Sequence, residues 1–304
     1  DNDGDLDLLV SGYDGPKPKL RLYENKDGAF TSQQLWEAFR TSLQKIGDTG
    51  RGAMAWTDFD GDGDLDLFIT GDTQDYNALP VPSTSSGPPP SGAVMYGGVL
   101  PPPYAAKARI LMNIGSSLPI NSKPGWAFRE LPVSLPPVVW RYQSFSGGMI
   151  ARAEWCDMDA DGAIDLVICG ERPHETNPRY TAATALILRN AGPDPATLGG
   201  WKFDEHRILT LTDDTIHTLT CADWDRDGRP DILMSGHTQG TTGVSAHILS
   251  QDDGFTFTRR SWLQPEVSGT PQYVGGPAAF GHFSGNDNRL DVMVCGMWGW
   301  IHAT

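Results

Sequence analysis

The chain contains the stretch Asp58-Phe59-Asp60-Gly61-Asp62-Gly63-Asp64-Leu65-Asp66-Leu67, followed directly by apolar residues. Alternating carboxylates on a glycine-broken turn bring several hard oxygens toward one point, and the backbone carbonyl of Asp64 adds another. The repulsion among these charges is strong at short range, and a divalent cation relieves it. Calcium suits the loop better than magnesium, because calcium accepts many oxygens in irregular geometry. The expected side-chain ligands are Asp58, Asp60, Asp62 and Asp66.

An EF-hand is a poor match to this stretch. The twelfth loop position, counted from Asp58, is Ile69 instead of the bidentate Glu that an EF-hand requires. The flanking residues also favour strands over helices. The stretch therefore predicts a calcium loop within a β-hairpin. The alternative is a solvated acidic turn, since Asp and Gly are also common turn formers.

The acidic pattern recurs, which favours metal binding over a simple turn. Two further complete copies have the side-chain ligands Asp157, Asp159, Asp161 and Asp165, and Asp223, Asp225, Asp227 and Asp231. Their carbonyl-donor places are Ala163 and Arg229, and a backbone ligand leaves the side chain free to differ. A copy truncated at the N-terminus contains Asp1, Asp3, Asp5 and Asp7. The prediction is three complete Ca²⁺ sites and a fourth truncated one.

A fifth copy is degenerate and is predicted to hold no metal. It runs from His282 to Asp291, with Ser284 and Asn286 in place of carboxylates. Measured between the last Asp of successive copies, the intervals are 59, 99, 66 and 60 residues. Each copy is followed by an apolar segment, a small residue and glycine, then a second apolar segment and an aromatic residue. About four short strands per unit are typical of a propeller blade.

The repeated unit resembles the FG-GAP or VCBS repeat, the blade of integrin α-subunit-like β-propellers. The resemblance covers nearly the whole chain and implies an all-β fold of four-stranded blades, with calcium in the hairpin between the first two strands. About four and a half blades fit into residues 1–304, treated as one domain. Since such propellers commonly have about seven blades, the resemblance implies that this domain is a fragment of a larger propeller, or else that it closes in an unusual way.

Composition supports this class and excludes others. The 304 residues are 39% apolar with 35 Gly and 23 Pro, which indicates a substantial core and many tight turns. A net charge of −15 argues against nucleic acid as a partner. No run of apolar residues is long enough for a transmembrane helix, so we expect no membrane span in this chain.

The four cysteines are interpreted as unpaired thiols. Cys169 and Cys295 take the small-residue place after the strand, whereas Cys156 and Cys221 lie before their loops in non-equivalent places. No zinc-binding spacing is present. Unpaired cysteines and the lack of an Asn-x-Ser/Thr sequon favour an intracellular location. The family resemblance implies an extracellular or cell-surface one, and the compartment therefore stays open.

Two segments depart from the blade pattern. Residues 72–108 form a Pro-rich insertion that is either a docking arm or a disordered connection. Residues 32–46 have helical spacing, which predicts a short helix or a strand with a loop. Trp56 and Trp155 are expected in the blade core, while Trp298 and Trp300 are less constrained.

The sequence offers no recognisable nucleophile, catalytic His arrangement or phosphate-binding glycine loop. We therefore expect a non-enzymatic, calcium-stabilised propeller that mediates protein–protein recognition, adhesion or scaffolding, with the 72–108 insertion as a candidate contact. The alternatives are a lectin-like carbohydrate-binding propeller and an accessory domain of a polysaccharide-degrading enzyme.

Overall fold

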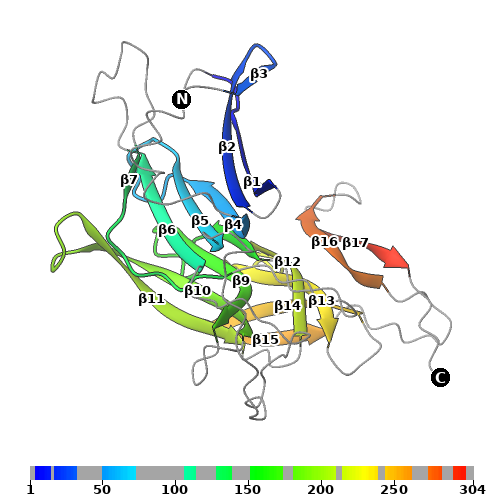
Figure 1. Cartoon of the computed structure of the whole chain (residues 1–304). Helices are drawn as coiled ribbons and strands as arrows, with labels where there is room; N and C mark the ends of the chain where they lie inside the picture. The colour runs from blue at the N-terminus through cyan, green and yellow to red at the C-terminus, as the bar shows by residue number, and fades with distance from the viewer. Residues whose placement is uncertain are drawn as a thin grey trace, which may run out of the picture. The chain divides into compact units, whose positions relative to one another are not determined.

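The computed structural model describes residues 4–14, 17–32, 50–72, 106–113, 128–138, 151–173, 181–209, 214–238, 244–261, 273–282 and 290–298. Within these residues every regular element is a β-strand, β1 to β17 (Figure 1), which confirms the predicted all-β class. No helix in this part of the chain has the length and hydrophobicity to cross a membrane.

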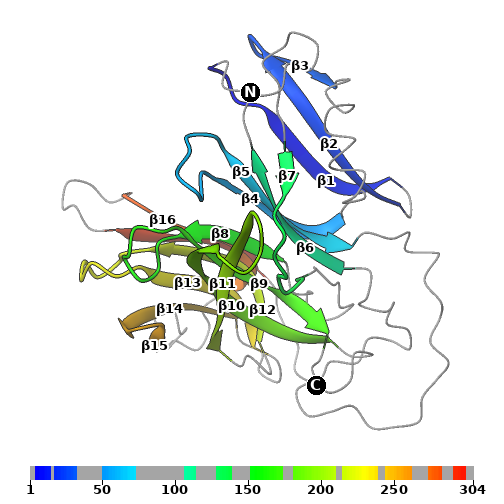
Figure 2. The ribbon, with the colours of Figure 1, turned by 90° about the vertical axis from the view of Figure 1, so that its left-hand side faces the viewer.

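The strands pair into successive sheets, and in each sheet the strands lie side by side in chain order. The first sheet has β1 (Leu8–Asp14), β2 (Lys17–Lys26) and β3 (Ala29–Ser32). The second has β4 (Gly50–Thr57), β5 (Asp66–Asp72), β6 (Ala106–Asn113) and β7 (Phe128–Glu130). Figure 2 shows the antiparallel strands of the first sheet along their length.

The remaining sheets repeat this arrangement. The third has β8 (Arg152–Cys156), β9 (Asp165–Pro173), β10 (Thr181–Asp194) and β11 (Gly200–Leu209). The fourth has β12 (Asp214–Ala222), β13 (Asp231–Thr238), β14 (Val244–Asp253) and β15 (Thr256–Ser261). The last described pair is β16 (Tyr273–Gly281) and β17 (Asp291–Trp298).

Repeated four-stranded antiparallel sheets are consistent with the propeller-like fold that the sequence predicts. The number of blades and their closure stay predictions. The described residues cluster into two compact units: those up to 138 together with 192–202 form the first, and those of 151–191 and 203–298 form the second.

The core of the first unit lies between the first two sheets. Leu20 and Leu22 of β2 pack with Leu67 and Ile69 of β5 and Leu111 of β6, and Phe128 completes the cluster. Three successive β5 residues, including Phe68, are almost fully buried. A strand covered on both faces needs apolar residues at consecutive positions, which explains the continuous apolar run after each loop.

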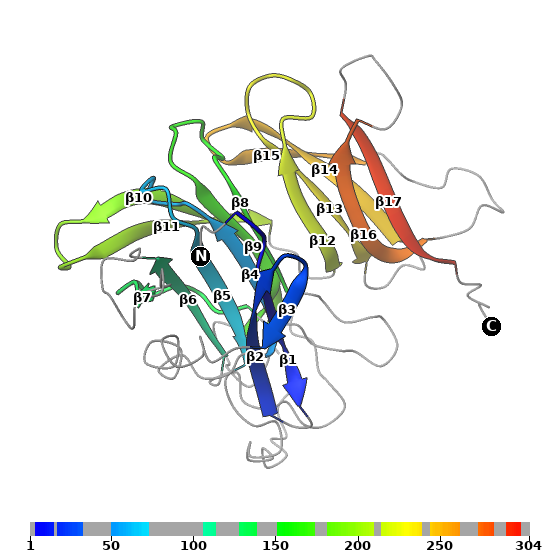
Figure 3. The ribbon, with the colours of Figure 1, turned by 90° about the horizontal axis from the view of Figure 1, so that it is seen from above.

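The core of the second unit has the same construction. Val167 and Cys169 of β9 and Ile187 of β10 pack with Ile232 and Met234 of β13. The strand β16 also packs against β12 and β13, and Figure 3 shows β12, β16 and β17 side by side. Cys169 is fully buried, as its predicted small-residue place requires, and burial raises the pKa of its thiol to about 12.

Close backbone approach explains one glycine of the second sheet. The pairing of β4 with β5 shifts register between Gly50 and Ala53. At Gly52 a Cβ atom would lie 1.5 Å from the carbonyl oxygen of Thr70, so no larger residue fits there without moving the backbone. The Thr70 hydroxyl donates a hydrogen bond of 2.8 Å to the carbonyl of Val138 and fixes the segment after β7.

Some sequence predictions lie outside the described residues. These are the helical spacing of 33–46, nearly all of the 72–108 insertion, the first ligands Asp1 and Asp3, and most of the fifth loop, 283–289. The side chains of Trp298 and Trp300 are also outside them.

Candidate metal loops

The three complete acidic loops occupy equivalent places in successive sheets. Residues 58–65 connect β4 to β5, residues 157–164 connect β8 to β9, and residues 223–230 connect β12 to β13. Each loop therefore lies in the hairpin between the first two strands of its sheet, as the sequence predicts. The truncated loop, with Asp5 and Asp7, precedes β1.

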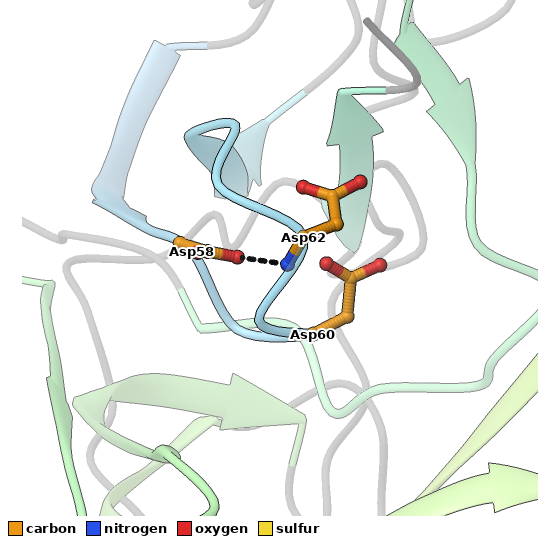
Figure 4. A group of neighbouring side chains, drawn as sticks. All are labelled: Asp58, Asp60 and Asp62. Carbon is orange, nitrogen blue, oxygen red and sulfur yellow. Dashed lines mark hydrogen bonds between the residues drawn. The ribbon is translucent and has the colours of Figure 1, made fainter.

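Each complete loop gathers three carboxylates whose oxygens lie within 4.8 Å of one another. The three groups are Asp58, Asp60 and Asp62; Asp157, Asp159 and Asp165; and Asp223, Asp225 and Asp231. Figure 4 shows the first group, in which the carboxylates of Asp60 and Asp62 project to the same side of the loop. Nine predicted ligands are thus brought together. The carboxylates of Asp64, Asp66, Asp161 and Asp227 and residues Ala163 and Arg229 are not members of these groups. The first group has Asp62 where the other two have the last aspartate of the loop, Asp165 or Asp231.

The first aspartate of each loop folds the turn. Asp58 accepts hydrogen bonds from the backbone N–H groups of Gly61, Asp62 and Gly63 at 2.8 to 3.0 Å. Asp157 and Asp223 make the same bonds with the fifth and sixth residues of their loops. This side chain satisfies backbone donors that would otherwise lack partners, so the loop holds its shape through its own sequence.

The fourth loop position has a left-handed backbone in all three copies. It is Gly61 in the first, with φ 77°, but Ala160 with φ 56° and Arg226 with φ 64° in the others. A left-handed conformation costs a non-glycine residue roughly 1 kcal/mol. The chain adopts it at Ala160 and Arg226 nevertheless, because the Asp hydrogen bonds fix the turn.

The last aspartate of each loop bridges two backbone segments. Asp66 accepts one bond from Phe59 N (3.2 Å) and another from Asn113 N (2.7 Å). The equivalent donors are Met158 and Asn190 for Asp165, and Trp224 and Gln251 for Asp231. In the first sheet, Asn25 N donates to Asp7 at 2.9 Å. The Asn or Gln at the end of the second apolar segment is therefore the point where the third strand is tied to the loop.

These last aspartates are buried, with at most 1% of Asp66, Asp165 and Asp231 exposed. Burial raises the pKa of Asp66 to about 7 and that of Asp165 to about 6, against the lowering effect of their backbone hydrogen bonds. Burial also raises the pKa of Asp231, and it raises that of Asp60 together with the charge of Asp62. A cation held in the loop reverses such shifts, because it favours the ionised carboxylate.

Two buried carboxylate oxygens support a cation at these loops. The Oδ1 atoms of Asp60 and Asp159 are buried and have no hydrogen-bond partner among the described residues. They occupy the same loop position, and a buried acceptor without a partner is costly. Oxygen donors of this type, clustered and underbonded, fit Ca²⁺.

The loops differ in whether an arginine side chain of the protein pairs with their carboxylates. Nε of Arg189, on β10, lies 2.5 Å from Oδ2 of Asp159, and its Nη2 lies 2.7 Å from Oδ2 of Asp161. Arg229 pairs with Asp227, while its Nε donates to the carbonyl of Gln251 at 3.1 Å. No Lys or Arg in the described part of the chain forms an ion pair with Asp58, Asp60 or Asp62 of the first complete loop.

The structure corrects the interpretation of the cysteines as unpaired thiols. Cys156 and Cys221 form a disulfide that joins β8 of the third sheet to β12 of the fourth. The two residues precede their loops by different numbers of positions, so alignment of the repeats does not indicate that they meet. Their pairing depends on how the two sheets pack.

Glu154 lies beside this disulfide. Its Oε1 accepts a bond from the Thr220 hydroxyl at 3.0 Å and one from Cys221 N at 3.4 Å. Burial raises the pKa of Glu154, partly offset by these bonds.

Trp56 differs from the prediction of a core position. Trp56 is 39% exposed, and the centroid of its ring lies 6.2 Å from that of the buried Phe128 in a tilted arrangement. The aromatic residue that does pack in this loop is Phe59, which is buried and meets the ring of Trp201 edge-on at 5.1 Å.

Comparison with known families agrees with the repeat. The family described as FG-GAP-like repeat matches residues 1–69 and 157–234, which supports an FG-GAP repeat protein. These two stretches contain all three complete loops and the truncated one. The comparison with curated proteins gave no match.

FG-GAP repeat domains are typically non-catalytic and often bind calcium. The family match therefore supports the repeat class, while integrin-like function is a separate question.

Proposed function

We propose that this chain is a non-enzymatic recognition or scaffolding domain whose acidic hairpin loops bind Ca²⁺. The observation that carries the proposal is that three carboxylates gather within 4.8 Å at the same hairpin of three successive sheets, the aspartates at the first and third loop positions being joined by Asp62, Asp165 or Asp231. If each sheet needs a bound ion, clustered carboxylates are expected to recur at the same hairpin. A solvated turn does not require such recurrence.

Each residue type has a distinct part in the proposed site. The first aspartate shapes the turn, the third position offers an underbonded oxygen at Asp60 or Asp159, and the last aspartate ties the loop to the third strand. Calcium would supply the positive charge that the clustered carboxylates lack. This role is structural, because the ion would hold strands together.

The test of calcium binding is isothermal titration of the metal-free protein with CaCl₂, with MgCl₂ as the comparison. We expect saturable calcium binding that is reduced by Asp60→Asn and again by Asp225→Asn, with much weaker magnesium binding. Asp204→Asn is the matched control, because it removes a half-buried carboxylate of β11 that lies outside the loops. Loss of binding in this control, or no calcium binding at all, would contradict the proposal.

We further propose a protein partner in preference to a glycan. Large apolar side chains of the first sheet support it, since Leu8 is 46%, Val10 42% and Phe30 53% exposed. Leu8 and Val10 lie on β1 and Phe30 on β3, and exposed apolar residues within one sheet favour protein contact. The disulfide between Cys156 and Cys221 supports an oxidising, extracellular setting for that contact.

The docking role of the Pro-rich insertion stays a prediction. Deleting Pro80 to Pro103 is expected to leave calcium-dependent melting intact and to abolish association with an isolated partner. Binding to a glycan array, with association unaffected by the deletion, would instead favour the lectin-like alternative.

A further inference from the structure

The residue before the loop-bound Asn or Gln differs in character from sheet to sheet. It is Met112 on β6, Arg189 on β10 and Ser250 on β14, and in each case the next residue donates its backbone N–H to the last aspartate of the loop. The three positions are therefore structurally equivalent. At this position the third sheet has the positively charged side chain of Arg189, whereas the second has the thioether of Met112 and the fourth the hydroxyl of Ser250.

Arg189 uses this place to reach the loop of residues 157–165. Its guanidinium bonds to Asp159 and Asp161, and Asp159 belongs to the carboxylate group of that loop. The pair is partly accessible, with 32% of the Arg189 side chain and 18% of the Asp159 side chain exposed. Arg189 can therefore move into solvent without breaking the core, and the loop is left with all its carboxylates.

Among the residues that the structure describes, no arginine or lysine pairs with the carboxylate groups of the other two loops. Met112 is nearly buried, and Arg129 donates to its sulfur. In the fourth sheet, Arg229 is bonded to Asp227, which lies outside the group of Asp223, Asp225 and Asp231.

We propose that Arg189 is a tethered cation that competes with Ca²⁺ for the loop of residues 157–165. This loop then fills after the other two as calcium rises, and Arg189 stabilises it when calcium is absent. The proposal rests on the calcium-binding function above and extends it to the order in which the loops fill. The third sheet would keep its loop folded at low calcium, while the second and fourth sheets would respond first.

The experiment isolates the third loop. The double variant Asp60→Asn, Asp225→Asn disables the other complete loops, and adding Asp159→Asn must remove the remaining calcium binding. In this background Arg189→Met, which installs the residue of the second sheet, is expected to raise the calcium affinity roughly tenfold, because a charge-assisted pair no longer has to break. Arg189→Lys keeps the charge without the bidentate fork and is expected to give an intermediate affinity.

A second measurement needs no metal. In EGTA, Arg189→Met should lower the melting temperature relative to the parent background, because the loop loses its resident positive charge. Met112→Arg in the otherwise unmodified chain is the reciprocal variant for binding, expected to weaken calcium binding at the second loop; its melting temperature is not compared, because Met112 is buried beside Arg129. Circular dichroism establishes that each variant is folded.

The outcomes separate this proposal from the proposed function. Unchanged or weaker calcium affinity in Arg189→Met, with binding still abolished by Asp159→Asn, overturns the competition and leaves calcium binding intact. No binding at the isolated loop with or without Arg189 also overturns it. No calcium binding by the unmodified chain overturns the proposed function itself.

Discussion

Asp231 and Asp225, two aspartates of the same loop, differ in burial and in the hydrogen bonds that their oxygens accept. Asp231 is buried and accepts backbone N–H groups of Trp224 and Gln251 through separate oxygens. Asp225 is exposed and lies in the same carboxylate group. The first residue is therefore a structural bridge as well as a candidate ligand, whereas the second is chiefly a candidate ligand.

This difference predicts opposite effects of isosteric substitutions. In the absence of calcium, Asp231→Asn should destabilise the protein by about 1 to 3 kcal/mol, because an amide can accept only one of the two buried bonds. Asp225→Asn should leave the metal-free stability unchanged or raise it, since it removes repulsion, and should lose calcium binding. Urea unfolding in EGTA measures both, and equal destabilisation by the two variants would contradict the assignment.

Glu154 provides a pH-dependent test. Burial raises its pKa above the ordinary 4.5, so the folded protein binds this proton more tightly than the unfolded chain does. The ionised carboxylate therefore costs stability at neutral pH, and that cost disappears as the pH falls through the raised folded value toward 4.5.

We expect Glu154→Gln to be at least as stable as the unmodified protein at pH 7, because the amide oxygen can still accept from Thr220. Its advantage should vanish near pH 4. Parallel urea titrations across this range measure the difference. A variant that is less stable at pH 7 but equal at pH 4 would show that the charge contributes favourably.

At the level of elements, the hairpin is the unit that the chain repeats, and a disulfide ties two such units together. Cys156 and Cys221 are separated by 65 residues, and their bond joins the first strands of two sheets. In the chain-entropy estimate, a disulfide that closes a loop of this length stabilises the folded state by about 4 kcal/mol, because it lowers the conformational entropy of the unfolded chain.

Reduction should therefore lower the melting temperature of the unmodified protein by several degrees. The double variant Cys156→Ser, Cys221→Ser should melt at the same lower temperature as the unmodified protein in reductant. Adding reductant to this variant should not change its melting temperature. Cys169 is buried in the core, so it should resist alkylation in the folded state. Alkylation of Cys156 and Cys221 in the native, unreduced protein would contradict the disulfide.

For the whole molecule, the three loops together place nine clustered carboxylates at the hairpins of three sheets. A ligand that binds the folded state alone stabilises it by about 2.7 kcal/mol at a concentration of 100 times its dissociation constant. Saturating calcium at several loops is therefore expected to add several kcal/mol in total.

Chelation with EGTA should lower the melting temperature, and re-added calcium should restore it. Differential scanning calorimetry with magnesium as the control measures this effect. An identical melting curve in calcium and in EGTA would show that the loops hold no stabilising ion.

The sequence by itself determined the β class, the place of each acidic loop in a hairpin and the position of most candidate ligands. These features are local, since the Asp and Gly residues that shape a loop lie within about nine positions of one another and their turn bonds stay within the loop. The apolar run after Asp66 likewise marks β5 without knowledge of its neighbours.

Only the tertiary structure decided the contacts between distant segments. Arg189 reaches Asp159 across 30 residues because β10 pairs with β9, and its signal in the sequence is visible only when Met112 and Ser250 are aligned with it. The pairing of Cys156 with Cys221, the exposure of Trp56 and the bridging by Asp231 depend in the same way on strand register and sheet packing. Local patterns carry no information on these, because many registers satisfy the same alternation of residues.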